Sequence, residues 1–87
     1  MALSSNGKEN MAFTYTYTYE SDTVFSILVS NEGTAYEKVE VTFLNHGTHT
    51  VKRSMDWSLC RDLKSLTVGD NVKIAVHGGN LRRVYKE

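Results

Sequence analysis

Hydrophobic and polar residues alternate along most of this chain, which predicts a protein built mainly of β-strands. The clearest run covers residues 13–19, where aromatic residues alternate with threonine. Successive side chains of a strand point to opposite faces, so these aromatic residues share one face of the expected strand. That face comprises Phe13, Tyr15, Tyr17 and Tyr19.

Five more strands are expected, each bounded by residues that favour turns. The charged segment 20–22 is read as the first turn, and two glycine-containing segments, 45–47 and 78–80, are read as hairpins. Residues 23–30 are apolar on both faces, which favours a central strand. In the fourth strand, Val51 and Met55 are expected to point inward. The five strands are predicted at residues 23–30, 36–44, 48–55, 72–76 and 81–85.

The hydrophobic spacing changes to a helical period after residue 56. Leu59, Leu63 and Leu66 recur at the spacing of one helix face, which predicts a short helix before the last hairpin. Either Asp56 or Ser58 is expected to cap its first turn. Trp57 is interpreted as a core anchor at the start of this helix.

This order of elements predicts a mainly β fold of about six strands with one short helix. Two architectures fit: a small, bent antiparallel sheet, or a small barrel of the SH3-like or OB-like kind. The helix would then cover one face or close one end.

The length of 87 residues predicts one domain, with residues 11–87 folded and residues 1–10 as a polar, flexible tail. No apolar run approaches the length of a membrane span, and no secretory signal pattern is present. Cys60 is the single cysteine, so no internal disulfide is expected. A cytoplasmic location is the hypothesis that follows.

The net charge is zero, but its distribution is uneven. Residues 1–44 carry two basic and six acidic residues, a net charge of −4, whereas residues 45–87 carry eight basic and four acidic residues, a net charge of +4. Such a chain either presents a basic face to an anionic partner or neutralises itself when its halves pack together.

No residue pattern indicates catalysis, a cofactor or a metal ion. His46, His49 and His77 lack a second close pair of ligands, and Cys60 falls within the expected helix as a small apolar side chain. The acidic pairs Glu20/Asp22 and Glu37/Glu40 are interpreted as turn and solvent-facing residues. The glycines belong to turns and form no phosphate loop. We therefore expect a protein that is not an enzyme.

The aromatic strand supports two readings that the sequence leaves open. Tyr15, Tyr17 and Tyr19 are either the core side of the strand or a binding surface, on which nucleic acid bases would stack. Lys73, Arg82, Arg83 and Lys86 from the final hairpin would supply the positive charge beside them. The same uncharged strand, if it lies at a sheet edge, would pair with a second copy or with another protein.

These observations favour a small non-enzymatic binding module. Protein–protein interaction, as a regulator or inhibitor, is the preferred hypothesis because nucleic-acid-binding domains usually carry a clear positive charge. A module that binds single-stranded nucleic acid is the alternative, and a homodimer through an edge strand is a third possibility. The expected binding residues are Tyr15, Tyr17, Tyr19, Lys73, Arg82, Arg83 and Lys86.

Overall fold

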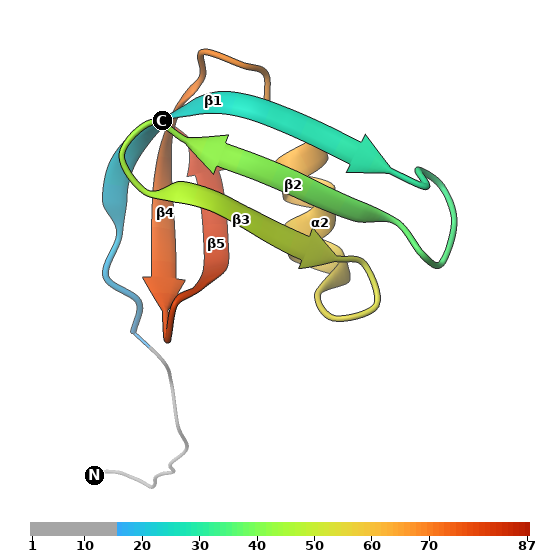
Figure 1. Cartoon of the computed structure of the whole chain (residues 1–87). Coiled ribbons are helices and arrows are strands. Elements are labelled where there is room, and N and C mark those ends of the chain that lie inside the picture. The colour runs from blue at the N-terminus through green and yellow to red at the C-terminus, as the bar shows by residue number, and fades with distance from the viewer. Residues whose placement is uncertain (1–15) are drawn as a thin grey trace, which may run out of the picture.

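The computed structural model describes residues 16–87 of the chain. Five strands and one helix follow one another along it (Figure 1). They are β1 (Glu20–Ser30), β2 (Lys38–Phe43), β3 (Gly47–Lys52), α2 (Trp57–Lys64), β4 (Asn71–His77) and β5 (Asn80–Lys86).

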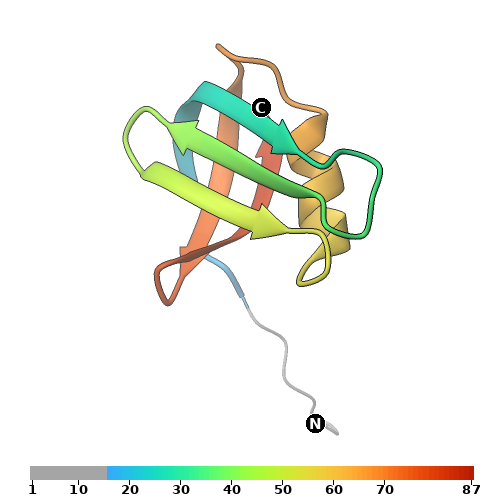
Figure 2. The ribbon, with the colours of Figure 1, turned by 45° about the vertical axis from the view of Figure 1, so that its right-hand side comes forward.

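The strands form one antiparallel sheet in the order β3-β2-β1-β4-β5. The long strand β1 belongs to both halves of the sheet, because its first residues pair with β4 and the rest pair with β2. The register shifts between Val24 and Ser26, and a bulge of this kind bends a strand and increases its twist. The β4–β5 hairpin therefore runs steeply across the direction of the other strands (Figures 1 and 2).

The core fills the space between the two halves of the bent sheet and α2. Phe43, Leu63 and Ile74 are its largest fully buried apolar side chains, contributed by β2, α2 and β4. Helix α2 packs against β2, β3 and β5, so it covers the inner side of the sheet. The helical stripe behaves as predicted, because Leu59, Leu63 and Leu66 are all buried. Asp56 caps the helix by accepting a hydrogen bond from the Leu59 backbone N–H.

The start of the sheet differs from the prediction. The described part of the predicted strand at 13–19, residues 16–19, is not a strand, and residues 13–15 lie outside the described residues, as does the predicted tail, 1–10. The predicted turn at 20–22 is instead the beginning of β1. His46 contacts the carboxylates of both Glu20 and Asp22, so a charged segment that looks like a turn is accommodated in a strand.

The bent open sheet is therefore the architecture that the chain adopts. The described residues hold five strands rather than about six, and no hydrogen-bonded pairing joins β3 to β5 among them, so a closed barrel is wrong. The sheet is open, with β3 and β5 as its two edge strands. The seam between β3 and β5 lies where the last strand pair of a closed barrel would form.

Both predicted hairpins are confirmed. Gly47 ends the β2–β3 turn with a φ of +74°, and Gly78 and Gly79 form the β4–β5 turn with φ of +62° and +79°. Two consecutive positive φ angles are typical of the tight turns that match the twist of a hairpin.

Several side chains lie elsewhere than the sequence pattern suggests. Strand β3 ends at Lys52, so Met55 lies beyond it in a turn and is 81% exposed. Trp57 is 53% exposed rather than a core anchor, because it lies about 200° around the helix from Leu59. The bulge in β1 turns Val24 into the core and leaves Phe25 61% exposed. Glu37, expected at the surface, is buried.

Candidate interaction surfaces

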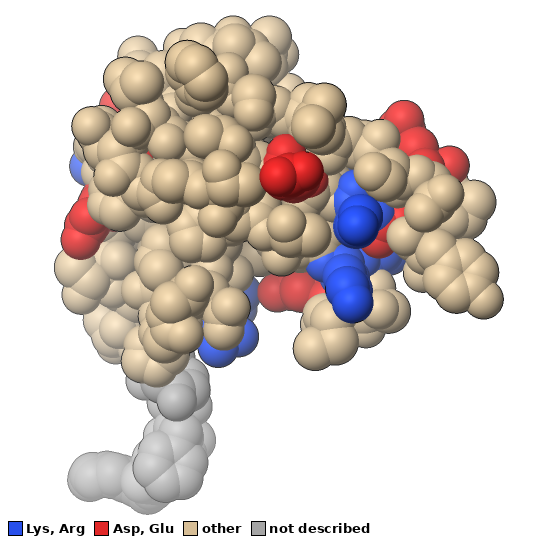
Figure 3. Space-filling view, viewed as in Figure 1, with Lys and Arg blue, Asp and Glu red and all other residues tan. Residues whose placement is uncertain are grey.

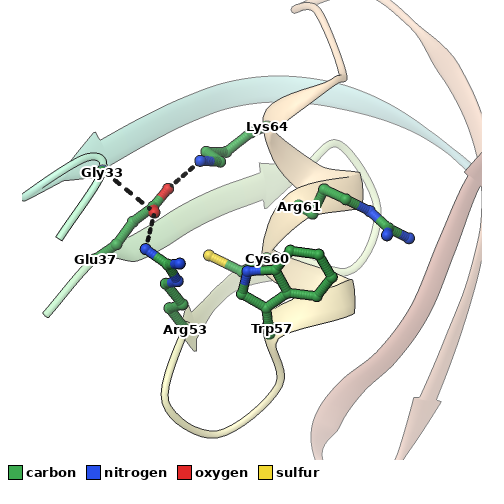
Figure 4. A pocket seen from close by; sticks show the side chains of 7 residues that line it. All are labelled: Gly33, Glu37, Arg53, Trp57, Cys60, Arg61 and Lys64. Carbon is green, nitrogen blue, oxygen red and sulfur yellow. Dashed lines mark hydrogen bonds and ion pairs between the residues drawn. The ribbon is translucent and has the colours of Figure 1, made fainter. Parts of the chain in front are cut away.

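A buried ionic cluster holds together the loop before β2, the turn after β3 and helix α2 (Figure 4). Its centre is the carboxylate of Glu37, of which only 2% is exposed. The Nζ atom of Lys64 lies 2.6 Å from one oxygen, and Nη1 of Arg53 lies 3.9 Å from the other. The backbone N–H of Gly33 donates to that second oxygen at 3.4 Å. Arg53 also donates to the carbonyl of Thr34, so it clamps the same loop twice.

The charges of this cluster stabilise one another. The hydrogen bond from Lys64 lowers the pKa of Glu37 despite the opposing effect of burial, and the same bond raises the pKa of Lys64. Both groups are therefore charged at neutral pH. Burial raises the pKa of the neighbouring Cys60 thiol, which keeps it protonated and unreactive. The cluster is structural: it fixes the positions of the two loops that flank α2.

Large apolar side chains are exposed beside this cluster, at the end of the molecule formed by those two loops. We call this surface the loop end; it comprises Ala35, Tyr36, Arg53, Ser54, Met55 and Trp57. Tyr36 is 82% exposed, which makes it, with Met55, among the most exposed large apolar residues of the described chain. Ala35 and Ser54 line two adjoining hollows, one shared with Trp57 and one shared with Tyr36, so the surface is continuous.

Trp57 is held in place although more than half of it is exposed. The guanidinium carbon of Arg61, one turn later on α2, lies 5.1 Å from the centre of the indole ring. This is a cation–π distance, and it presents tryptophan and arginine together at the surface. Positive charge also gathers nearby, where Lys38 and Lys52 lie opposite each other on β2 and β3 (Figure 3).

A second hollow lies along the open seam of the sheet. It has a volume of about 420 Å³ and is bounded by the second half of β3, the start of α2 and the start of β5. Its floor is apolar, formed by the buried residues Val51, Leu59 and Leu81, and Lys52, Met55 and Arg82 stand around it. The space-filling view shows a recess in the molecule below the front strands (Figure 3).

A third surface gathers part of the predicted binding site on the outer face of β4 and β5. The rings of Tyr19 and Tyr85 meet edge to face at 5.2 Å, and both are partly exposed, at 40% and 48%. The guanidinium of Arg83 lies over the ring of Tyr17 at 5.2 Å. The described tyrosines of the first predicted strand therefore lie on the outside of the sheet, beside the last hairpin.

The predicted basic residues do not form one patch. Nζ of Lys73 lies 3.8 Å from a carboxylate oxygen of Glu87, and Nη1 of Arg83 lies 4.0 Å from one of Asp56. Arg82 lines the seam hollow instead, and Lys86 approaches Asp70 at 3.7 Å. Tyr15 lies outside the described residues.

A compact cluster of charged groups joins the β2–β3 turn to the start of β1. Nδ1 of His46 contacts the buried carboxylate of Asp22, and its Nε2 lies 2.5 Å from an oxygen of Glu20. Hydrogen bonds to these carboxylates raise the pKa of His46. Burial tends to raise the pKa of Asp22, but hydrogen bonds from His46 and from the N–H groups of Thr23 and Asn45 lower it overall. Both ring nitrogens of His46 therefore contact carboxylates at the start of β1.

The loop end and the seam were missed by the sequence analysis. Helical spacing could have predicted the exposure of Trp57, because the stripe formed by Leu59, Leu63 and Leu66 implies that Trp57 faces away from the core. The burial of Glu37 could not be predicted from the sequence, because its partners Arg53 and Lys64 come from distant elements. The seam depends on which strands fail to pair, and alternation alone carries no such information.

The comparisons with known proteins give no further assignment. No protein-family model, curated protein sequence or solved structure matches this chain. Across residues 16–87, no helix is long and apolar enough to cross a membrane. Within the same residues, no group of three or more histidine, cysteine or acidic side chains is arranged to hold a metal ion.

Proposed function

We propose that this chain is a small, non-enzymatic protein-interaction module whose partner binds at the loop end. It would act as a regulatory or inhibitory subunit in the cytoplasm, where the buried thiol of Cys60 stays reduced. The observation that carries the proposal is the exposed Trp57, whose hollow adjoins that of the exposed Tyr36 through Ala35 and Ser54.

The residue types at the loop end support this proposal. Tryptophan, tyrosine, methionine and arginine are enriched in protein interfaces, and tryptophan, tyrosine and arginine supply most of the residues that dominate binding energy. Here Arg61 lies over Trp57, and Arg53 lines the same hollow as that side chain. A surface that exposes several large apolar side chains together is typical of an interaction site.

The rigidity of the loop end is a second support. The Glu37 cluster anchors both loops before any partner arrives, through Gly33, Arg53 and Lys64. A surface that is already ordered loses less conformational entropy on binding than a mobile one.

The test compares capture by three forms of the immobilised protein: wild type, Trp57→Ala and Phe25→Ala. Phe25 is a matched control because it is aromatic, similarly exposed and placed on β1 away from the loop end. We expect a protein that binds wild type and Phe25→Ala but not Trp57→Ala. With the purified partner, the Trp57→Ala substitution should raise the Kd at least about tenfold, the effect of losing about 1.4 kcal/mol. Equal affinity for all three forms would refute the proposal.

A second candidate function is binding of single-stranded nucleic acid at the outer face of β4 and β5. Tyr17, Tyr19 and Tyr85 with Arg83 provide aromatic rings beside positive charge, the combination on which bases stack. Lys73 and Arg83 each have a carboxylate within 4.0 Å, which weakens the attraction for phosphate and places this candidate second.

Fluorescence anisotropy of labelled single-stranded RNA and DNA separates the two candidates. Nucleic acid binding predicts affinity that falls steeply between about 50 and 200 mM salt and that is lost in the Tyr19→Ala, Arg83→Ala double variant. Absence of binding at the lower salt concentration removes this candidate and leaves the protein-interaction proposal unaffected.

A further inference from the structure

One edge of β3 presents backbone groups that no strand of the described chain engages. The N–H of Arg53 donates to the carbonyl of Glu37 at 2.9 Å, so this pair continues the β2–β3 ladder in hydrogen-bonded register. Hydrogen-bonded pairs alternate along an antiparallel ladder. His49 and Val51 therefore bond to β2, whereas the backbone groups of Thr48, Thr50 and Lys52 point away from it.

Two contacts agree with this alternation. The hydroxyl oxygens of Thr42 and Thr48 lie 2.8 Å apart, the close approach of side chains expected for a non-hydrogen-bonded pair. The carbonyl of Lys52 accepts hydrogen bonds from the N–H groups of Met55 and Asp56, so it does face away from β2. The groups left at the free edge are the N–H and C=O of Thr48 and of Thr50, and the N–H of Lys52.

This edge lacks the irregularity by which edges usually resist pairing. The register between β2 and β3 is continuous from Lys38↔Lys52 to Phe43↔Gly47, with no bulge. The other edge strand, β5, is different, because its register with β4 shifts between Ala75 and Val76. A regular edge accepts an added strand, whereas a bulged edge discourages one.

The seam hollow lies directly beside the free edge of β3. Its apolar floor, Val51, Leu59 and Leu81, is within reach of every second side chain of a strand laid along that edge. Two cations stand at the hollow, Lys52 and Arg82, and neither forms an ion pair with any residue of the described chain. The acidic residue of the hollow, Asp56, already caps α2 and lies near Arg83.

We infer that the free edge of β3 takes up an extended peptide segment with alternating apolar and acidic residues. The segment would pair antiparallel or parallel to β3, place apolar side chains over the seam hollow and set carboxylates beside Lys52 and Arg82. This inference rests on the proposed function, since it names the part of the partner that is recognised. The loop end begins where β3 ends, so one partner chain reaches both surfaces.

The first experiment uses a synthetic peptide in which valine and glutamate alternate, with a valine–lysine peptide of the same length as the control. Amide NMR spectra of the full chain are recorded during titration. We expect the valine–glutamate peptide to shift the amide signals of Thr48, Thr50 and Lys52 and to slow their hydrogen exchange. The valine–lysine peptide should bind at least about tenfold more weakly.

Two variants test the pairing and the charge separately. Thr50→Pro removes an N–H that β2 does not use, a position at which a strand edge accepts proline, and Thr50→Ala retains that N–H. Binding should be lost in Thr50→Pro and kept in Thr50→Ala. The Lys52→Glu, Arg82→Glu double variant should reverse the preference between the two peptides. It also tests the inference if Thr50→Pro does not fold.

The outcomes that overturn the inference are distinct. One is the absence of amide shifts in β3 at millimolar valine–glutamate peptide, and another is an unchanged affinity in Thr50→Pro. Protection of the β3 amides that grows with protein concentration, without peptide, would assign the edge to a second copy of this chain. A purified partner that needs Trp57 but tolerates Thr50→Pro would retain the proposed function and reject strand addition.

Discussion

The ammonium group of Lys64 lies 2.6 Å from a carboxylate oxygen of Glu37, although the two residues come from the last turn of α2 and the loop before β2. Substituting Glu37→Gln keeps the shape of this side chain but removes its charge, which leaves Lys64 and Arg53 without their anion. We expect lower stability and looser flanking loops, measured as a fall in the thermal unfolding midpoint and faster amide exchange at Gly33.

The matched control is Glu40→Gln, a change at an exposed residue of β2. Its effect should stay within about 0.5 kcal/mol of the wild-type free energy of unfolding. If the two substitutions had equal effects, the Glu37 cluster would not be the anchor described above.

Stability should depend on pH through His46 and Asp22. The pKa of His46 is raised from 6.5, so its contribution is complete below that value and is lost as pH rises through the raised pKa. The pKa of Asp22 is lowered from 3.8, so its contribution is complete above that value and is lost as pH falls through the lowered pKa. Both contributions are therefore present together between pH 3.8 and 6.5.

The measurement is the difference in unfolding free energy between wild type and His46→Gln in urea, across this pH range. The difference should be largest inside the window and should shrink as pH rises well above it. His49→Gln serves as the control, because Nε2 of His49 lies 3.1 Å from the carbonyl oxygen of His46 and His49 forms no ion pair with a carboxylate of the described residues. A difference that does not change with pH would contradict the charged state assigned to His46.

Helix α2 should depend on one capping residue. Asp56 accepts the hydrogen bond from the Leu59 N–H at 3.1 Å, so Asp56→Ala should lower the free energy of unfolding by about 0.5–2 kcal/mol. Ser58→Ala, at the other residue able to cap a helix here, should have little effect. Urea unfolding of the two variants measures both effects. A larger loss of unfolding free energy in Ser58→Ala than in Asp56→Ala would contradict the assignment of Asp56 as the cap.

Trp57 provides a direct optical test of the loop end, because it is the single tryptophan of the sequence. With 53% of the side chain exposed, its fluorescence should be quenched by iodide in the native protein. Binding of a partner at the loop end should protect it and shift its emission to shorter wavelength. Emission already at short wavelength and resistant to iodide would indicate the buried position that the sequence suggested.

Local patterns predicted most of the elements. Alternation located the strands that became β2, β3, β4 and β5, and the leucine spacing located α2 with its buried face. Glycines with positive φ, such as Gly47 and Gly79, mark turns that only a residue without a side chain adopts easily. These features succeed because each is decided by neighbours close in sequence.

The errors arise where distant residues decide the outcome. The charged start of β1 was predicted to be a turn, because its counter-charge, His46, lies 24 residues after Asp22 in the sequence. The bulge at Val24 changes which side of β1 faces the core, and one extra residue is enough to do so. The binding residues were predicted from their chemistry alone, and the fold places Arg82 at the seam hollow while Tyr19 packs against Tyr85.

The shared strand β1 also imposes an order on folding during synthesis. Its second half forms a meander with β2 and β3, which can be complete once residue 52 has emerged from the ribosome. Its first half has to wait for residues 71–74, which arrive only after the helix. During that interval on the ribosome, Val39, Val41 and Phe43 have no cover from α2 or β4. A nascent chain paused there would offer its inner face to chaperones.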